Sequence, residues 1–210
     1  MALALSACGG GQRLDANEPG GNFTVSVPTA SFPVSQTLSE HTHLVLVIRN
    51  ASNTAIPNLA VTICNVTCAY PAPPGEGSSA APFATGNPQE YISNPSKPVW
   101  VIDQPPGPCS GVHGYSCASG GAGAYTTLAA NTWALGSALQ PGHSATFRWA
   151  VTAVAPGHHV VAWQVAAGLS GKAKAVLADG SQPQGTFPVN IGTAPAQSYV
   201  TDSGQIVTTK

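Results

Sequence analysis

Residues 144–166 have the sequence SATFRWAVTAVAPGHHVVAWQVA, in which large apolar residues recur at every second position. In the first half Phe147, Trp149 and Val151 follow this spacing, and in the second half Val161, Trp163 and Val165 do. A period of two is typical of a β-strand with one buried face. The Pro156-Gly157 pair between the halves favours a type II turn, because proline presets the first central φ and glycine accepts the positive second one. The stretch therefore predicts two strands joined by a turn.

Further strands are predicted on both sides of this pair. Leu44, Leu46 and Ile48 share one face of a strand at 43–49, and turn formers at 50–54 separate it from a strand at 59–63. The other expected strands lie at 98–103, 174–177 and 185–191, and no amphipathic helical period of useful length is present. Short strands with turn signals at this spacing are typical of a sandwich. We predict an all-β, immunoglobulin-like antiparallel β-sandwich over residues 22–191.

A long insertion at about 67–125 interrupts the strand pattern. Residues 70–97 are rich in Pro, Gly, Ser and Ala, and residues 105–125 are rich in Gly. Loops longer than about 12–15 residues are uncommon unless they are functional or disordered. We expect any binding partner to be met by the loops at 67–98 and 104–125, and the alternative is a solvated insertion pinned by a disulfide. Residues 192–210 form a C-terminal tail with one weak strand at 205–208.

Several of these stretches resemble a known family of domains. The segments at 44–50 and 56–62, the Pro141-Gly142-His143 turn before its strand, and the segment at 156–161 look like CARDB-type and related bacterial immunoglobulin-like domains. The resemblance implies the sandwich fold and an adhesive, spacer or scaffold role at a cell surface. The insertion departs from the compact pattern of that family, and leaves open whether a spacer role is the whole function.

The N-terminus carries a second resemblance. Leu5-Ser6-Ala7-Cys8, followed by three glycines, resembles a bacterial lipobox, which implies that Cys8 is acylated and becomes the new N-terminus. More than one acyl chain on Cys8 would attach the protein stably to a membrane. A secretory signal needs a basic start and roughly 7–15 apolar residues. Residues 1–8 supply only a truncated signal, so we expect the true start upstream, the alternative being a chance match.

The anchor predicts how the N-terminal part of the chain is organised. Residues 9–21 are Gly-rich and polar, and we expect a flexible tether there. The protein is then expected to be extracytoplasmic and lipid-anchored to the cell membrane, with a cell-surface protein or glycan as its candidate partner.

Four cysteines remain once Cys8 is set aside, and an even number in an exported chain indicates two disulfides. We favour Cys64 with Cys68 and Cys109 with Cys117 among the three possible connectivities. This choice requires the strand at 98–103 to lie antiparallel beside 59–65. Cys109 then emerges about 20 Å from Cys68 at ~3.3 Å per residue, whereas bridged Cα atoms lie within roughly 7 Å.

Composition excludes some classes of function. Only 7% of residues are charged and the net charge is −1, against about 25% charged residues in an average soluble domain. Basic residues are scattered, so no nucleic-acid footprint is present. No run of 18 apolar residues predicts a membrane span.

The chain carries no convincing catalytic constellation. Gly114-Tyr115-Ser116-Cys117-Ala118 approaches a nucleophile elbow, but the final glycine is missing and no helix pattern follows. Carboxylates are too sparse for an acid–base pair, and no phosphate-binding loop is present. We therefore expect a protein that is not an enzyme and uses no cofactor.

Metal and sugar binding are the main alternatives. Cys109-x₃-His113-x₃-Cys117 holds three potential metal ligands, but in an oxidising compartment a disulfide is preferred, and we predict no metal site. His41-x-His43 and His158-His159 add imidazoles, and His41 and His43, which share one strand face, are better explained as a solvent-facing pair. We expect all four tryptophans in the core, although Trp100 and Trp133 border the long loops, where an exposed pair could stack against a sugar.

Overall fold

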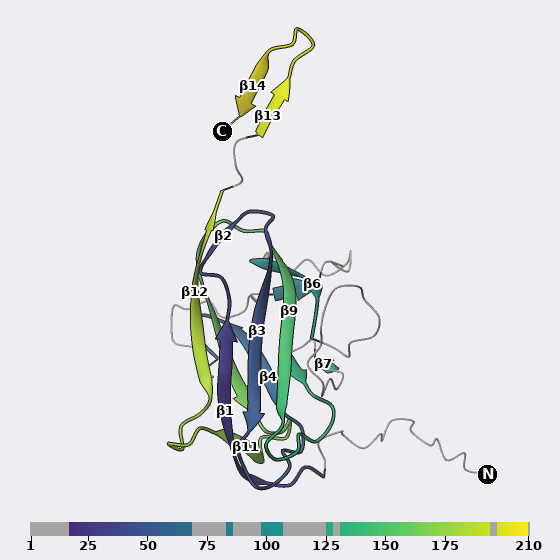
Figure 1. Cartoon of the computed structure of the whole chain (residues 1–210), viewed down its shortest axis with the longest axis vertical. Helices are drawn as coiled ribbons and strands as arrows, with labels where there is room; N and C mark the ends of the chain where they lie inside the picture. The colour runs from purple at the N-terminus through teal and green to yellow at the C-terminus, as the bar shows by residue number, and fades with distance from the viewer. Residues whose placement is uncertain are drawn as a thin grey trace, which may run out of the picture.

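The protein is built from strands alone in the residues that the computed structural model describes, which are 17–68, 83–85, 98–106, 125–127, 131–193 and 197–209. Two six-stranded sheets lie against each other, and a separate two-stranded hairpin follows them (Figure 1). Within these residues no helix is long and apolar enough to cross a membrane.

The first sheet has the strand order β11-β1-β3-β9-β6-β5. Its strands are β1 (Gly21–Ser31), β3 (His41–Asn50), β5 (Phe83–Thr85), β6 (Trp100–Gln104), β9 (Ser144–Ala153) and β11 (Ala173–Val176). The central strand β3 runs antiparallel to both of its neighbours, β1 and β9, whereas the edge strands β11 and β5 run parallel to β1 and β6.

The second sheet has the strand order β2-β12-β10-β4-β8-β7. Its strands are β2 (Ser35–Thr37), β4 (Ala60–Asn65), β7 (Tyr125–Thr127), β8 (Thr132–Ala134), β10 (Gly157–Ala166) and β12 (Gln184–Gly192). Only the edge strand β2 runs parallel to its neighbour. The predicted all-β, immunoglobulin-like sandwich is confirmed, with parallel pairs added at three of its four edges.

The predicted alternation places the core between the sheets. Leu44, Leu46 and Ile48 on β3 are fully buried, as are Trp149 and Val151 on the adjacent β9. The residues between them on each strand point outward and are exposed or half-buried. Burying each such side chain contributes roughly 1.5–3 kcal/mol, so this alternation is the main source of the fold's stability.

Aromatic side chains join the two sheets. Trp133 on β8 and Trp149 on β9 meet edge to face, with ring centroids 5.3 Å apart and planes at 86°. Trp100 on β6 donates its Nε1–H to Oε1 of Gln36 on β2 at 2.8 Å, a buried hydrogen bond between the sheets. Edge-to-face pairs add to the energy of area burial. Residues from the predicted insertion are therefore part of the core.

A glycine in β12 makes room for one of the core tryptophans. Gly185 lies opposite Trp163 of β10 in the register of the sheet, and a Cβ at Gly185 would lie 2.7 Å from the indole. We expect Gly185→Ala to lower the free energy of unfolding by about 1–3 kcal/mol, because the indole must shift inside a packed core. Gly192→Ala is the matched control, because its Cβ would meet nothing closer than 3.7 Å. Urea denaturation that shows equal losses for both variants would contradict the close packing.

The insertion joins the sandwich at a different place from the one predicted. We expect the strand at 98–103 to lie beside 59–65, but the structure places β6 in the first sheet, between β9 and β5. The neighbours of β4 are instead β10 and β8. Trp100 and Ile102 both point into the core from the first sheet, where they pack with residues of β9. The assumed pairing behind the disulfide argument is therefore wrong.

The two ends of the described chain leave the sandwich at opposite ends. The tether expected at 9–21 is held from Glu18 onward, because that carboxylate accepts hydrogen bonds from the N–H groups of Leu169 and Ser170. In the tail, the expected strand at 205–208 is present as β14 (Ile206–Thr209), which pairs with β13 (Gln197–Val200). Figure 1 shows β1 starting at the end where β11 lies and the hairpin beyond the other end.

Candidate functional site

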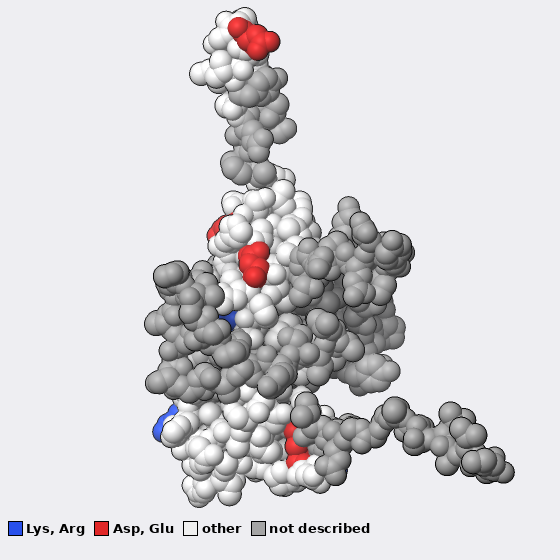
Figure 2. All heavy atoms as spheres, turned by 90° about the vertical axis from the view of Figure 1, so that its right-hand side faces the viewer, with Lys and Arg blue, Asp and Glu red and all other residues white. Residues whose placement is uncertain are grey.

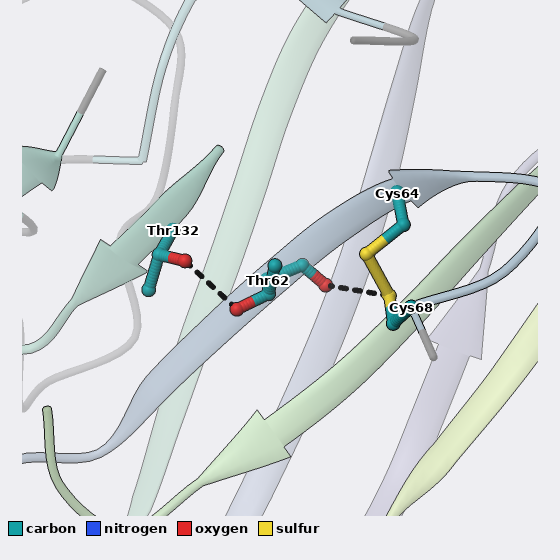
Figure 3. Close-up of a disulfide and its surroundings, with 4 residues drawn as sticks. All are labelled: Thr62, Cys64, Cys68 and Thr132. Carbon is teal, nitrogen blue, oxygen red and sulfur yellow. Dashed lines mark hydrogen bonds between the residues drawn. A yellow bond between two sulfur atoms is a disulfide. The ribbon is translucent and has the colours of Figure 1, made fainter. Parts of the chain in front are cut away.

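The structure describes two of the five cysteines for which a chemical role is predicted. Cys64 ends β4 and Cys68 follows it, and the two form the predicted disulfide (Figure 3). Cys8, Cys109 and Cys117 lie outside the described residues. His113 and Ser116 do so as well. The lipid anchor and the second disulfide therefore remain predictions, and so does the expectation that His113 and Ser116 form no metal or hydrolase site.

The disulfide closes a small ring at the end of β4. The Cα atoms of Cys64 and Cys68 are 5.2 Å apart, and Thr62 lies beside the ring. The carbonyl oxygen of Thr62 is 3.9 Å from Sγ of Cys68, and its hydroxyl is hydrogen-bonded to Thr132 on β8 at 2.8 Å. The ring is thus attached to a strand that is paired on both sides.

Val66, at the centre of this ring, has an unusual backbone conformation. Its φ is +62°, which is a genuine outlier for a β-branched residue. The N–H of Thr67 donates to the carbonyl of Asn65 at 2.7 Å, across Val66. A hydrogen bond over two residues with a positive central φ defines the rarer, strained kind of γ-turn. Such a conformation costs of the order of 1–3 kcal/mol.

Ring closure and backbone strain oppose each other here. A ring of five residues, from 64 to 68, is expected to stabilise the fold by about 2 kcal/mol through chain entropy. The strain at Val66 is of similar size. We expect the double variant Cys64→Ser, Cys68→Ser to change the free energy of unfolding by less than about 1 kcal/mol. Urea denaturation followed by tryptophan fluorescence measures this change, and a loss above ~3 kcal/mol would show that the disulfide is a structural staple.

A polar cluster lies on the outer face of the first sheet, where β3, β9 and β6 are adjacent. Thr152 donates its hydroxyl proton to Oδ2 of Asp103 at 2.7 Å. Nδ1 of His41 lies 2.8 Å from the Thr152 hydroxyl and 3.2 Å from Oδ2 of Asp103. The register between β6 and β9 shifts between Ile102 and Gln104, and bulges of this kind re-aim side chains. The bulge therefore places Asp103 within reach of β3.

His43 lies on the same outer face, two residues further along β3. Its pKa is lowered from the ordinary 6.5, first by partial burial, then by the positive charge of Arg148, with Asp103 opposing both. The folded protein thus favours neutral His43, whereas the unfolded chain protonates it near pH 6.5. Because the unfolded state binds more protons below that pH, stability falls as the pH is lowered from about 6.5 towards the folded-state pKa.

This titration predicts a change in pH dependence. We expect His43→Gln to flatten the decrease in melting temperature between about pH 7.5 and about pH 5.5, because the variant has no proton to take up on unfolding. His143→Gln, at an exposed turn position, is the control for the replacement of a histidine by glutamine. Thermal melts at several pH values measure the slopes. Identical slopes for wild type and His43→Gln would contradict the assignment.

The chemical capacity of this cluster is limited. The His41 side chain is 77% exposed and that of Asp103 is 36% exposed, and exposed ion pairs contribute at most about 1 kcal/mol. Thr152 directs its proton to a carboxylate, which holds β6 against β9 rather than activating a nucleophile. Across the described ranges, no three His, Cys, Asp or Glu side chains lie close enough to hold a metal ion.

The tryptophans and the surface charge bear on ligand binding. Trp100 and Trp133 are 0% and 1% exposed, so the core assignment is confirmed and the sugar-stacking alternative for this pair is wrong. Trp149 and Trp163 are buried as predicted. Figure 2 shows only scattered Lys, Arg, Asp and Glu side chains on the described part of one face. A binding surface there would have to rely on neutral polar and apolar groups.

Similarity to known proteins is confined to solved structures. No family model and no curated protein matches the chain. Among solved structures, it is similar to alpha-2-macroglobulin of E. coli, at 12% identity and a TM-score of 0.40 over 83% of this chain and 7% of that one. The CARDB domain of the PF1109 protein from Pyrococcus furiosus is 9% identical, with a TM-score of 0.38 over 81% of this chain and 85% of that domain.

A human domain is also similar. The seventh PapD-like domain of human CEP192 is 11% identical, with a TM-score of 0.34 over 94% of this chain and 99% of that domain. At such identities the likenesses concern the fold alone. The chain spans only a small part of the alpha-2-macroglobulin that it resembles.

Proposed function

We propose that this chain is a non-enzymatic, lipid-anchored extracytoplasmic protein whose β-sandwich is a structural or adhesive module. The observation that carries the proposal is the Cys64–Cys68 disulfide. Disulfides persist in oxidising compartments outside the cytoplasm, and Leu5-Ser6-Ala7-Cys8 supplies a matching export and anchoring signal. Lipid on Cys8 also leaves an even number of cysteines for disulfides.

The position of Glu18 supports an orientation for the anchored molecule. Its carboxylate accepts hydrogen bonds from the backbone of the loop at 169–170, so the expected tether is fixed to the sandwich at Glu18. Glu18 lies ten positions after Cys8, which limits the distance between them to about 35 Å at ~3.5 Å per residue. The end of the sandwich near β11 then faces the membrane, and the β13–β14 hairpin points away from it (Figure 1).

Metabolic labelling tests the anchor. The chain is expressed with its upstream reading frame in a bacterial host that is fed radiolabelled palmitate. We expect label on the wild-type protein and none on Cys8→Ser. The double variant Cys64→Ser, Cys68→Ser should keep the label, because in the wild type these two sulfurs are bonded to each other and carry no lipid. An unlabelled wild-type protein would remove the anchor from the proposal.

The alternative is a carbohydrate- or metal-binding module that uses the loops at 67–98 and 104–125. The Cys109-x₃-His113-x₃-Cys117 spacing favours it, and β5 and β6 place parts of the insertion at a sheet edge. Glycan arrays and metal analysis of the oxidised protein separate the two functions. A bound glycan or a stoichiometric metal ion would support the binding module. If neither is found, the structural role is favoured. A fluorophosphonate probe that labels Ser116 would contradict the non-enzymatic assignment.

A further inference from the structure

We propose that the Cys64–Cys68 disulfide is a thiol–disulfide exchange site for dithiol reductants, and that its reduction releases the strained γ-turn at Val66. The inference goes beyond the proposed function, and it holds whether or not Cys8 carries lipid. It concerns the five-residue ring at the end of β4 and the point where the chain leaves that strand.

Backbone strain makes this ring easier to open. Val66 lies inside the ring that the disulfide closes, at a φ of +62° and with the N–H of Thr67 donating to the carbonyl of Asn65. Without the bridge, Val66 is free to return to the negative φ that β-branched residues prefer. Reduction therefore relieves the strain of the turn, which favours the reduced state. Strained or exposed disulfides are the ones that reductants open most readily.

The ring is also accessible to a reagent. The Val66 side chain is 39% exposed, and Cys64 and Cys68 are half-buried rather than enclosed in the core. A thiolate must reach one sulfur along the S–S bond, so access is a condition of exchange. The position of the ring at the end of a strand, outside the hydrophobic core cluster, meets that condition.

Opening the ring leaves the sandwich in place. Cys64 is paired in register with Ala162 of β10, and the N–H of Val66 donates to the carbonyl of Val160. On its other side β4 pairs with β8. These contacts do not depend on the disulfide, so the expected change is confined to the turn and to the exit of the chain at Cys68.

The exchange proceeds in two balanced steps. A thiolate of the dithiol attacks one cysteine sulfur, the S–S bond breaks, and its electron pair leaves on the other cysteine, which takes a proton from water. The second thiol of the reagent loses its proton to water and attacks the mixed disulfide as a thiolate, and the first cysteine leaves as a thiolate that takes up a proton. The dithiol loses two electrons and becomes a disulfide, and Cys64 and Cys68 become two thiols.

A redox titration of the full-length protein tests the inference. The oxidised protein is equilibrated with mixtures of reduced and oxidised dithiothreitol, free thiols are alkylated, and the modified 64–68 peptide is quantified by mass spectrometry. Val66→Asn relaxes the turn, because asparagine tolerates a positive φ. We expect its equilibrium constant for reduction to be about tenfold lower than that of wild type. Val154→Asn, at another exposed valine, is the control and is expected to match wild type.

The outcomes are distinct from those of the palmitate experiment. Two results together support the exchange site. The equilibrium constant for reduction is lower for Val66→Asn than for wild type, and the reduced wild-type protein keeps the β-sheet circular dichroism spectrum of the oxidised protein. Equal constants for wild type and Val66→Asn, or loss of the sheet spectrum on reduction, would overturn it. If Val66→Asn fails to fold, Val66→Gly serves as the second relaxing variant, because glycine also accepts a positive φ.

Discussion

Replacing Trp100 by alanine is expected to lower the free energy of unfolding by about 3–5 kcal/mol, the largest effect of any single substitution considered. Trp100 is fully buried and packs against Phe32 and Phe83, with ring centroids 5.3 and 5.8 Å away. Its indole N–H also binds Gln36 across the two sheets. Alanine removes the ring, leaves a cavity and strips the buried amide oxygen of its donor, and urea denaturation measures the combined loss.

Trp100→Phe separates packing from hydrogen bonding. Phenylalanine keeps most of the apolar surface but cannot donate to Oε1 of Gln36, so we expect about 1–3 kcal/mol of destabilisation from the unsatisfied acceptor. A Trp100→Ala protein within ~1 kcal/mol of wild type would contradict the placement of β6 in the core. It would mean that this part of the insertion does not belong to the sandwich.

Replacing Asn50 by alanine is expected to cost about 3 kcal/mol, because one buried and two part-buried hydrogen bonds to the backbone lose about 1 kcal/mol each. Asn50 is fully buried at the end of β3. Its amide donates to the carbonyls of Thr54 and Leu139, at 2.9 and 2.8 Å, and its Oδ1 accepts the N–H of Ser52. The side chain therefore holds the turn at 50–54 and connects it to the chain before β9.

Asn53→Ala is the matched control for Asn50→Ala. Asn53 belongs to the same turn but is exposed, and exposed substitutions usually change stability by no more than about 0.5 kcal/mol. Urea denaturation of both variants should give free energies of unfolding that differ by about 2–3 kcal/mol. Equal stabilities would show that the hydrogen bonds of the Asn50 side chain do not hold the turn.

Alternation in the sequence predicts which residues are buried, but not which strands are neighbours. Phe147, Trp149 and Val151 are buried as their spacing indicates. The same period cannot tell that β6 pairs with β9 rather than with β4, because a period of two defines a face and not a partner. No strand is predicted over β1, where Pro28 interrupts the alternation and the register shifts between Ser26 and Thr29.

The candidate sites show the same limit of sequence reasoning. His41, Asp103 and Thr152 are brought together by the order of three strands, from positions 62 and 49 residues apart. The sequence marks His41 only as one of two histidines on a strand face, and no local signal connects it to the other two. The strained φ of Val66 is equally hidden, since a valine in a short Cys-x₃-Cys ring gives no reason to expect a positive φ.

The most direct test of the proposed anchored module is the intact mass and N-terminal sequence of the mature protein from the membrane fraction, produced from the upstream reading frame. We predict a chain that begins at Cys8 and carries a mass increase equal to a diacylglycerol group plus an amide-linked acyl chain. For Cys8→Ser, we expect no processed, lipid-modified protein in the membrane fraction. A mature chain with an unmodified Cys8, or with Cys8 in a disulfide, would contradict the proposal.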